Sequence, residues 1–141
     1  MTWEYNDGGR KDAGYSGKTG DCVVRAIAIA TERDYQEVYD EMNEFIRSLR
    51  QTRRARRASS ATGMHKSIDR RYLKQRGWSY TPTMAIGQGC KVHLRAEELP
   101  KGRLIVQVSK HLTAVIDGVI HDTYDPSRQG TRCVYGYWSK K

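Results

Sequence analysis

The order of hydrophobic patterns along this chain predicts an α+β domain, with helices first and an antiparallel sheet after them. In the first half, apolar residues recur every three or four positions, whereas short runs rich in β-branched residues fill the second half. The 141 residues are enough for one hydrophobic core, so we expect a single domain spanning residues 1–141.

Two helices are expected before residue 51. The first begins at Asp21, whose carboxylate would cap the free N–H groups of the first turn. Its apolar residues lie on most sides and predict a buried helix: Val23, Val24, Ile27, Ala28 and Ala30. The second begins with Asp34 and Glu37, spaced as a capping box, and runs to about residue 49 or 50.

A basic segment and a third helix follow. Residues 51–63 contain four arginines and no apolar face, so we expect a basic mobile loop there. The third helix is expected over residues 66–76, with Ile68, Tyr72 and Leu73 facing inward. Gly77 ends it, because glycine readily adopts the left-handed conformation that follows many helices.

The remaining chain is expected to form strands. Residues 103–108 are rich in β-branched residues, and residues 78–81, 91–94 and 133–138 form shorter candidates. Residues 1–20 hold few aliphatic side chains, and we expect them to form a lead-in that covers part of the domain.

A hairpin is expected over residues 111–124, because Asp117-Gly118 is a favoured two-residue turn. This turn sets the cross-strand partners: Ile116 with Val119, Val115 with Ile120, Thr113 with Asp122, and His111 with Tyr124. Because residues two apart on a strand share a face, His111, Thr113 and Asp122 are expected on the same face of the hairpin.

Cys22 and His111 suit a nucleophile and its general base. A helix N-terminus stabilises a thiolate, and Cys22 is expected in the first turn of a buried helix. A histidine within hydrogen-bonding distance would accept the thiol proton. Asp122 is the preferred residue to orient the imidazole, because it is the diagonal neighbour of His111; Asp125 remains the alternative, since it begins the following loop.

The segment Gly20-Asp21-Cys22 at a helix start, with His111 opening a hairpin and an aspartate on its return strand, resembles the papain-like cysteine peptidase superfamily. The nearest similarity is to bacteriocin-processing peptidases, and transglutaminase-like and arylamine acetyltransferase enzymes share the same residue order. The whole chain also resembles small uncharacterised phage and prophage proteins that carry segments like residues 20–28 and 111–122.

This resemblance implies a Cys-His-Asp catalytic triad at Cys22, His111 and Asp122. It implies a thiol hydrolase or acyl transferase acting on a peptide, isopeptide or amide bond of a protein or peptide substrate. Papain-like peptidases place an oxyanion-stabilising glutamine about six residues before the cysteine. Here that position is Ser16, so the Cys22 amide, together with Ser16 or Lys18, is expected to bind the oxyanion.

The net charge of +9 supports an alternative interpretation, a non-catalytic binding protein on the same scaffold. Its anion-binding residues would be Arg53, Arg54, Arg56 and Arg57. These arginines would contact nucleic acid or another polyanion such as an acidic host protein, with strong salt dependence. Simple solvation of an arginine-rich loop would explain the same residues equally well.

The cysteine count bears on compartment and on metal binding. Three cysteines cannot all pair, and no secretory signal precedes them, so we expect reduced thiols and a cytoplasmic protein, in the host cytoplasm if phage-encoded. Cys90 and His93, with Cys133 and His121, have some of the spacing of a zinc site, but only one close pair is present, so we expect no metal and no cofactor. No run of apolar residues is long enough to cross a membrane.

Overall fold

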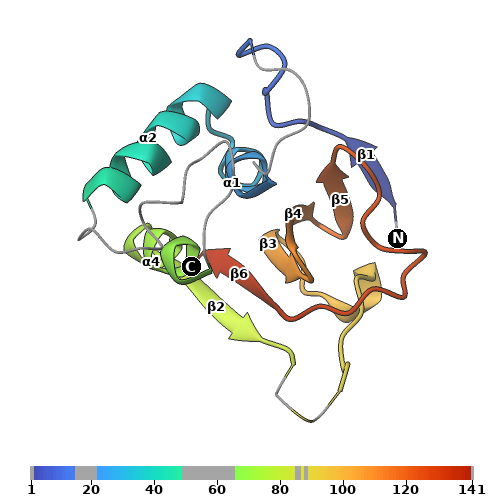
Figure 1. Ribbon diagram of the computed structural model, residues 1–141. Helices are drawn as coiled ribbons and strands as arrows, with labels where there is room; N and C mark the ends of the chain where they lie inside the picture. The colour runs from blue at the N-terminus through green and yellow to red at the C-terminus, as the bar shows by residue number, and fades with distance from the viewer. Residues whose placement is uncertain (1, 15–21, 49–65, 85–86, 88, 141) are drawn as a thin grey trace.

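The structure is a computed structural model that describes residues 2–14, 22–48, 66–84, 87 and 89–140. Within these residues, three α-helices lie on one side of a six-stranded mixed sheet, which confirms the α+β class (Figure 1). The helices are α1 (Cys22–Thr31), α2 (Tyr35–Ser48) and α4 (Lys66–Gln75). The strands are β1 (Trp3–Tyr5), β2 (Trp78–Pro82), β3 (Arg103–Val108), β4 (His111–Ile116), β5 (Val119–Asp122) and β6 (Gly136–Lys140).

The sheet has the strand order β1-β5-β4-β3-β6-β2, and it is not wholly antiparallel as expected. The lead-in contributes β1, which pairs in parallel with β5. A three-residue strand is too short to show a period, and its partner lies far along the chain, so local pattern could not reveal this pairing.

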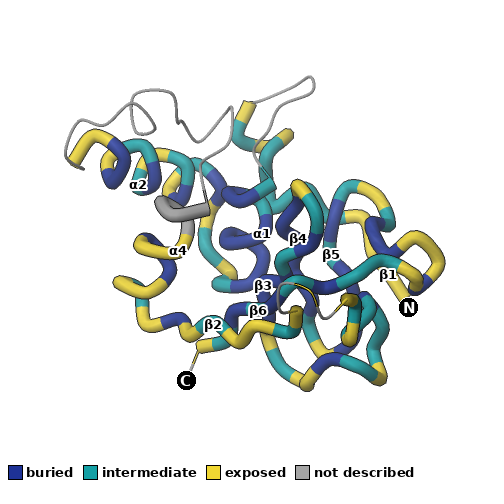
Figure 2. Tube along the Cα trace, turned by 60° about the horizontal axis from the view of Figure 1, so that its bottom comes forward, coloured by how far each residue is buried: buried dark blue, intermediate teal, exposed yellow. Residues whose placement is uncertain are grey.

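The helix α1 is buried on most sides, as its apolar sequence predicted (Figure 2). It packs against β4 and β3 on the sheet and against α2 on its other side. Ile105 at the centre of the sheet is paired with both Ala114 and Trp138, and all three belong to the core cluster that includes α1. The first core therefore lies between the helices and the middle strands.

A second, smaller core covers the opposite face of the sheet. Strand alternation sends Leu104, Val106 and Val108 of β3 to this face, together with Val115 and Ile120. Irregular segments rather than helices cover them, through Leu94, Leu99 and Val134. Both faces of the middle strands are therefore buried, which explains the nearly continuous apolar run in β3.

The β4–β5 hairpin has the predicted turn and register. Asp117 and Gly118 both have positive φ, at 48° and 81°, as a type I′ turn requires. The strand partners Ile116–Val119 and Val115–Ile120 follow directly. The Asp117-Gly118 turn therefore determines which side chains lie opposite each other at the open end of the hairpin.

Three sequence-based expectations in the second half are wrong. The last strand begins at Gly136 rather than at residue 133, and residues 91–94 form only an isolated bridge between His93 and Cys133. Cys90 and Cys133 are joined by a disulfide, so these thiols are not reduced. The bond connects two irregular segments distant in sequence, and such proximity has no local signature.

Several expectations fall outside the described residues: the Asp21 cap, the end of the second helix at 49–50, the loop at 51–63 and the side chain of Ile68. The other expectations for the second and third helices agree with the structure. The backbone N–H of Glu37 donates to Asp34 Oδ2 at 3.1 Å, Tyr72 and Leu73 are buried, and Gly77 has a φ of 87°.

Glu41 on α2 ties the helices together through hydrogen-bonded charges. Both guanidinium Nη atoms of Arg33 donate to its carboxylate at 3.0 and 2.9 Å, and Arg76 Nε donates at 2.8 Å. The Tyr72 hydroxyl also donates to Glu41. The hydrogen bonds from Arg33 outweigh the effect of burial and, with those from Tyr72 and Arg76, lower the pKa of Glu41 to about 2.

We predict that Glu41→Gln lowers the free energy of unfolding at pH 7 by about 1–3 kcal/mol, because two arginines and a tyrosine lose a charged acceptor. Since the pKa of Glu41 is lowered by folding, its contribution exists above the unfolded pKa and is lost as the pH falls toward 2. Urea denaturation at several pH values measures this. Glu44→Gln is the matched control, because Glu44 is exposed and pairs with exposed Arg47 at 3.5 Å; equal effects of the two variants would contradict the prediction.

Candidate active site

Cys22 is the first residue of α1 and is half-buried. Its position follows from the burial of the helix, whose apolar residues begin at Val23 and continue through Ala30. The aligned peptide dipoles of α1 favour negative charge at this end, where a thiolate would lie. Because Cys90 and Cys133 form the disulfide, Cys22 is the one free thiol of the chain.

His111 and Asp122 form a buried hydrogen-bonded pair at the open end of the β4–β5 hairpin. His111 Nε2 lies 2.7 Å from Asp122 Oδ2, and the two side chains are only 8% and 4% exposed. His111 is the first residue of β4, and Asp122 is the last residue of β5. The hairpin register expected from the sequence therefore produces this contact.

Further hydrogen bonds hold the Asp122 carboxylate in place. The Thr113 hydroxyl donates to Oδ2 at 2.7 Å, and the backbone N–H of Thr123 donates to Oδ1 at 2.7 Å. The alternative acid, Asp125, instead accepts the backbone N–H of Ser127 at 3.0 Å. Asp122 is therefore the aspartate that contacts His111, and its carboxylate is oriented from both sides.

The electrostatics favour a charged imidazole. Burial by itself would lower the pKa of His111, but hydrogen bonds with Asp122 and with Cys22, and the charges of both partners, raise that pKa to about 9. Burial would raise the pKa of Asp122, but hydrogen bonds from His111, Thr113 and Thr123 lower it. Because Asp122 occupies Nε2, the remaining nitrogen, Nδ1, is left for the thiol of Cys22.

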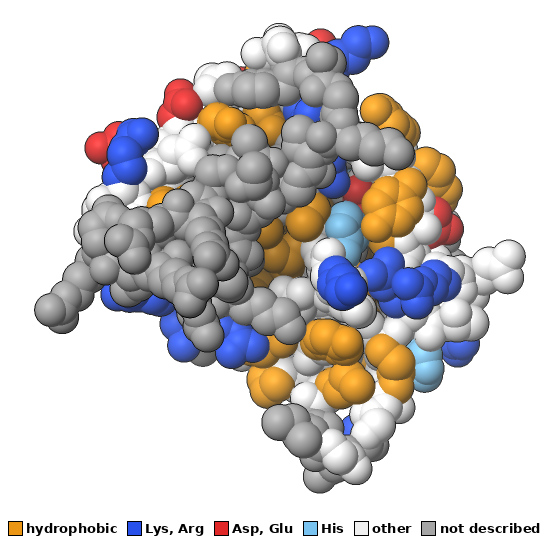
Figure 3. All heavy atoms as spheres, in the orientation of Figure 1, with side chains coloured by type: hydrophobic (Ala, Val, Ile, Leu, Met, Phe, Trp, Pro, Cys, Tyr) orange, Lys and Arg blue, Asp and Glu red, His pale blue; other side chains and the backbone are white. Residues whose placement is uncertain are grey.

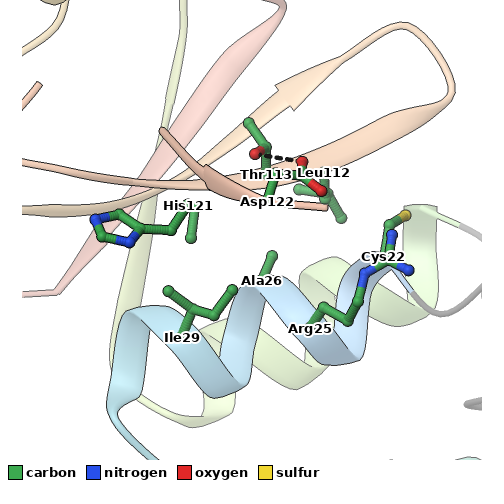
Figure 4. A pocket seen from close by; sticks show the side chains of 9 residues that line it. Cys22, Arg25, Ala26, Ile29, Leu112, Thr113, His121 and Asp122 are labelled. Atoms are coloured by element: carbon green, nitrogen blue, oxygen red, sulfur yellow. Dashed lines mark hydrogen bonds between the residues drawn. The ribbon is translucent and has the colours of Figure 1, made fainter. Parts of the chain in front are cut away.

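A small pocket lies where α1 meets the hairpin (Figure 4). Figure 4 shows Cys22 at the beginning of the helix and the Thr113–Asp122 hydrogen bond on the strands beside it. Residues of both elements line the pocket: Cys22, Arg25, Ala26, Ile29, Leu112, Thr113, Ala114, His121 and Asp122. The cysteine and the aspartate, one hundred residues apart in the chain, thus border the same space.

The structure brings together Cys22, His111 and Asp122 but does not describe the other proposed site residues. Ser16 and Lys18, expected at the oxyanion, and Arg53, Arg54, Arg56 and Arg57, expected to bind anions, lie outside the described residues. The hairpin pattern predicts the correct face for Thr113 but indicates no function for this residue. Its register position opposite Asp122 was the signal that could have identified it as a hydrogen-bond donor.

The four residues that the sequence offered for a zinc site do not form a metal site. Cys90 and Cys133 are bonded to each other, His93 contacts Glu98 at 3.3 Å, and His121 lies at the α1 pocket instead. In the described part of the chain, no three His, Cys, Asp or Glu side chains are grouped to bind a metal ion. Among the same residues, no helix has the length and apolar character needed to cross a bilayer.

Comparison with known proteins gives no match: no family model, no curated protein and no solved structure is significantly similar to this chain. The assignment of the site therefore rests on the geometry given above.

We predict that His111 titrates with a pKa near 9 in the native protein and near 6.5 when unfolded. The resulting stabilisation is fully present below about pH 6.5 and is lost as the pH rises through 9. It amounts to something on the order of 3 kcal/mol. NMR titration of the imidazole and denaturation between pH 6 and 10 measure both quantities.

Asp122→Asn removes the charge that favours the imidazolium, so the native pKa of His111 should fall and the loss of stability above pH 6.5 should largely disappear. Asp125→Asn is the matched control, because that carboxylate contacts Ser127 instead of the imidazole. If the two variants titrate alike, Asp122 is not the residue that controls His111.

We predict that Thr113→Val lowers stability by about 1–2 kcal/mol and raises the pKa of Asp122, because the buried carboxylate loses a donor at 2.7 Å. Thr123→Val should have a smaller effect, since Thr123 donates mainly through its backbone N–H, which the variant retains. Chemical denaturation and carboxyl NMR titration of both variants provide the comparison.

Proposed function

We propose that the chain is a thiol hydrolase or acyl transferase of the papain-like type, acting on a peptide, isopeptide or amide bond. One observation carries this proposal: a buried histidine is hydrogen-bonded to an aspartate at 2.7 Å, and the free cysteine at the start of α1 is among the groups that raise its pKa. Together these groups supply a nucleophile, a base and an orienting acid.

In the first step, the Sγ atom of Cys22 forms a bond to the carbonyl carbon, and the thiol proton is held by His111. The carbonyl π electrons move to oxygen and produce a tetrahedral oxyanion. The backbone N–H of Cys22 is available to donate to this oxygen, because the first N–H groups of a helix lack partners within the helix. His111 then gives its proton to the leaving amine as the C–N bond breaks.

In the second step, water or a second amine attacks the thioester carbonyl. His111 removes the proton of the attacking group, and the C–S bond breaks to return the thiol of Cys22. Asp122 holds the imidazole in one tautomer and stabilises the imidazolium through both steps. Its two supporting hydrogen bonds keep the carboxylate from rotating toward solvent.

The Asp122 carboxylate compensates for the burial of the His111 imidazole. A buried imidazole would lose its charge without a compensating partner, because removal from water disfavours the charged form. His111 is 8% exposed and yet has a raised pKa, so the hydrogen-bonded anion outweighs the cost of desolvation. The arrangement stabilises charge separation between sulfur and imidazole.

We predict fast alkylation of Cys22 by iodoacetamide well below pH 8, where an ordinary thiol reacts slowly. His111→Ala should reduce the rate at pH 6 by at least about tenfold, because the thiolate loses its cationic partner. The rate is measured across pH 4–10 by mass spectrometry on the non-reduced protein. Cys22→Ser provides the blank, and His93→Ala, a histidine paired with Glu98, is the matched control.

An ordinary thiol profile that His111→Ala leaves unchanged would refute the catalytic assignment. The alternative from the sequence, a non-catalytic basic binding protein, would then be tested by measuring polyanion binding at several salt concentrations. A shifted profile would lead directly to screening of peptide and amide substrates.

A further inference from the structure

Large hydrophobic side chains exposed to solvent are concentrated at one edge of the sheet. Four such side chains occur among the described residues, and three of them lie near β1 and β5: Trp3 is 39% exposed, Tyr5 is 69% exposed and Tyr124 is 46% exposed. The fourth, Met84, is 37% exposed and follows β2 at the opposite end of the strand order. We call Trp3, Tyr5 and Tyr124 the aromatic surface.

The aromatic surface borders the acid of the candidate site. Tyr5 is the strand partner of Asp122, Trp3 is the partner of Ile120, and the Asn6 N–H donates to the Asp122 carbonyl at 2.8 Å. Trp3 and Tyr5 share one face of β1, because they are two residues apart. Glu4 projects to the other face, where it lies 3.7 Å from His121.

Tyr124 borders the base. Its ring packs against the imidazole of His111, with the ring centroids 5.3 Å apart and the planes inclined by 47°. In Figure 3, hydrophobic side chains over the β1 edge lie next to a histidine on the same face of the molecule. The aromatic surface therefore contacts the residues proposed to perform the chemistry through Tyr124, and Tyr5 is the strand neighbour of Asp122.

The composition of the aromatic surface defines what it can bind. None of its three side chains carries a charge, and each offers a flat ring that bears one polar group, a hydroxyl or an indole N–H. Such rings favour apolar and aromatic groups through buried area and edge or offset stacking. A charged side chain placed there would lose hydration without finding a counter-ion among these three residues.

We infer that the aromatic surface selects the substrate: it binds an aromatic or bulky apolar side chain next to the scissile carbonyl of a peptide. This inference rests on the proposed function, because it concerns the substrate of the same site. The side chain would lie against Tyr5 and Tyr124, and this contact would hold the neighbouring carbonyl near Cys22 and His111. Small or charged residues at that position would be poor substrates.

The test uses two chloromethyl ketones that differ only in the side chain, N-acetyl-phenylalanine and N-acetyl-alanine chloromethyl ketone. In each, Cys22 Sγ forms a thioether with the methylene carbon, chloride leaves and the thiol proton is released. We expect the second-order rate constant to be about tenfold larger for the phenylalanine reagent in the native chain. The ratio of the two rates within one variant is normalised for thiol reactivity, because the same thiol reacts with both reagents.

Tyr5→Ala and Tyr124→Ala should bring the normalised phenylalanine-to-alanine ratio close to one, whereas Tyr124→Phe should retain it. Met84→Ala is the matched control, an exposed apolar residue remote from the site, and should keep the native ratio. A native ratio near one would overturn the inference, as would a large ratio that survives both alanine variants. In either case the surface does not select the side chain.

The experiments distinguish failure of the proposed function from failure of this inference. If Cys22 is an ordinary thiol, its iodoacetamide profile shows this independently, and the reagent ratio can still be measured at a pH where the thiol ionises. A large ratio with an ordinary thiol would mean that the surface binds aromatic groups beside a non-catalytic cysteine. A shifted profile with a ratio near one would mean that the site is reactive but does not select aromatic side chains.

Discussion

Seven of the ten residues of α1 are buried, so this helix is stable only where other elements exclude water from nearly its whole circumference. The middle of the sheet covers one side and α2 covers the other. Ala26 lies where the helix faces the hairpin, and its small side chain leaves room for the strands there. This packing places the first turn of α1 beside the open end of the β4–β5 hairpin, and the candidate site depends on that placement.

Two opposing effects act on the charges of His111 and Asp122 at the open end of the hairpin. Burial disfavours charge on both His111 and Asp122, yet the hydrogen bonds between them, with those from Thr113 and Thr123, more than compensate. Each partner therefore depends on the other, because loss of either one would leave a buried charge uncompensated. The hydrogen bond also orients the imidazole, and a general base needs a defined orientation toward its nucleophile.

The two faces of the sheet contribute differently to the molecule. The helical face positions the thiol, while the opposite face is covered by irregular segments that the Cys90–Cys133 disulfide connects. Because the disulfide uses the other two cysteines, only Cys22 remains as a nucleophilic thiol. At the β1 edge the sheet ends in exposed aromatic residues, which are next to His111 and Asp122.

The sequence by itself determined the features that depend on neighbouring residues. Spacing predicted α2 and α4, and the Asp117-Gly118 turn determined the hairpin register and hence the contact between His111 and Asp122. Only the tertiary structure decided the parallel pairing of β1, the start of β6, the Cys90–Cys133 bond and the meeting of Cys22 with His111. These contacts join distant parts of the chain, so they arise from packing of the whole core and leave no period or dipeptide signal in the sequence.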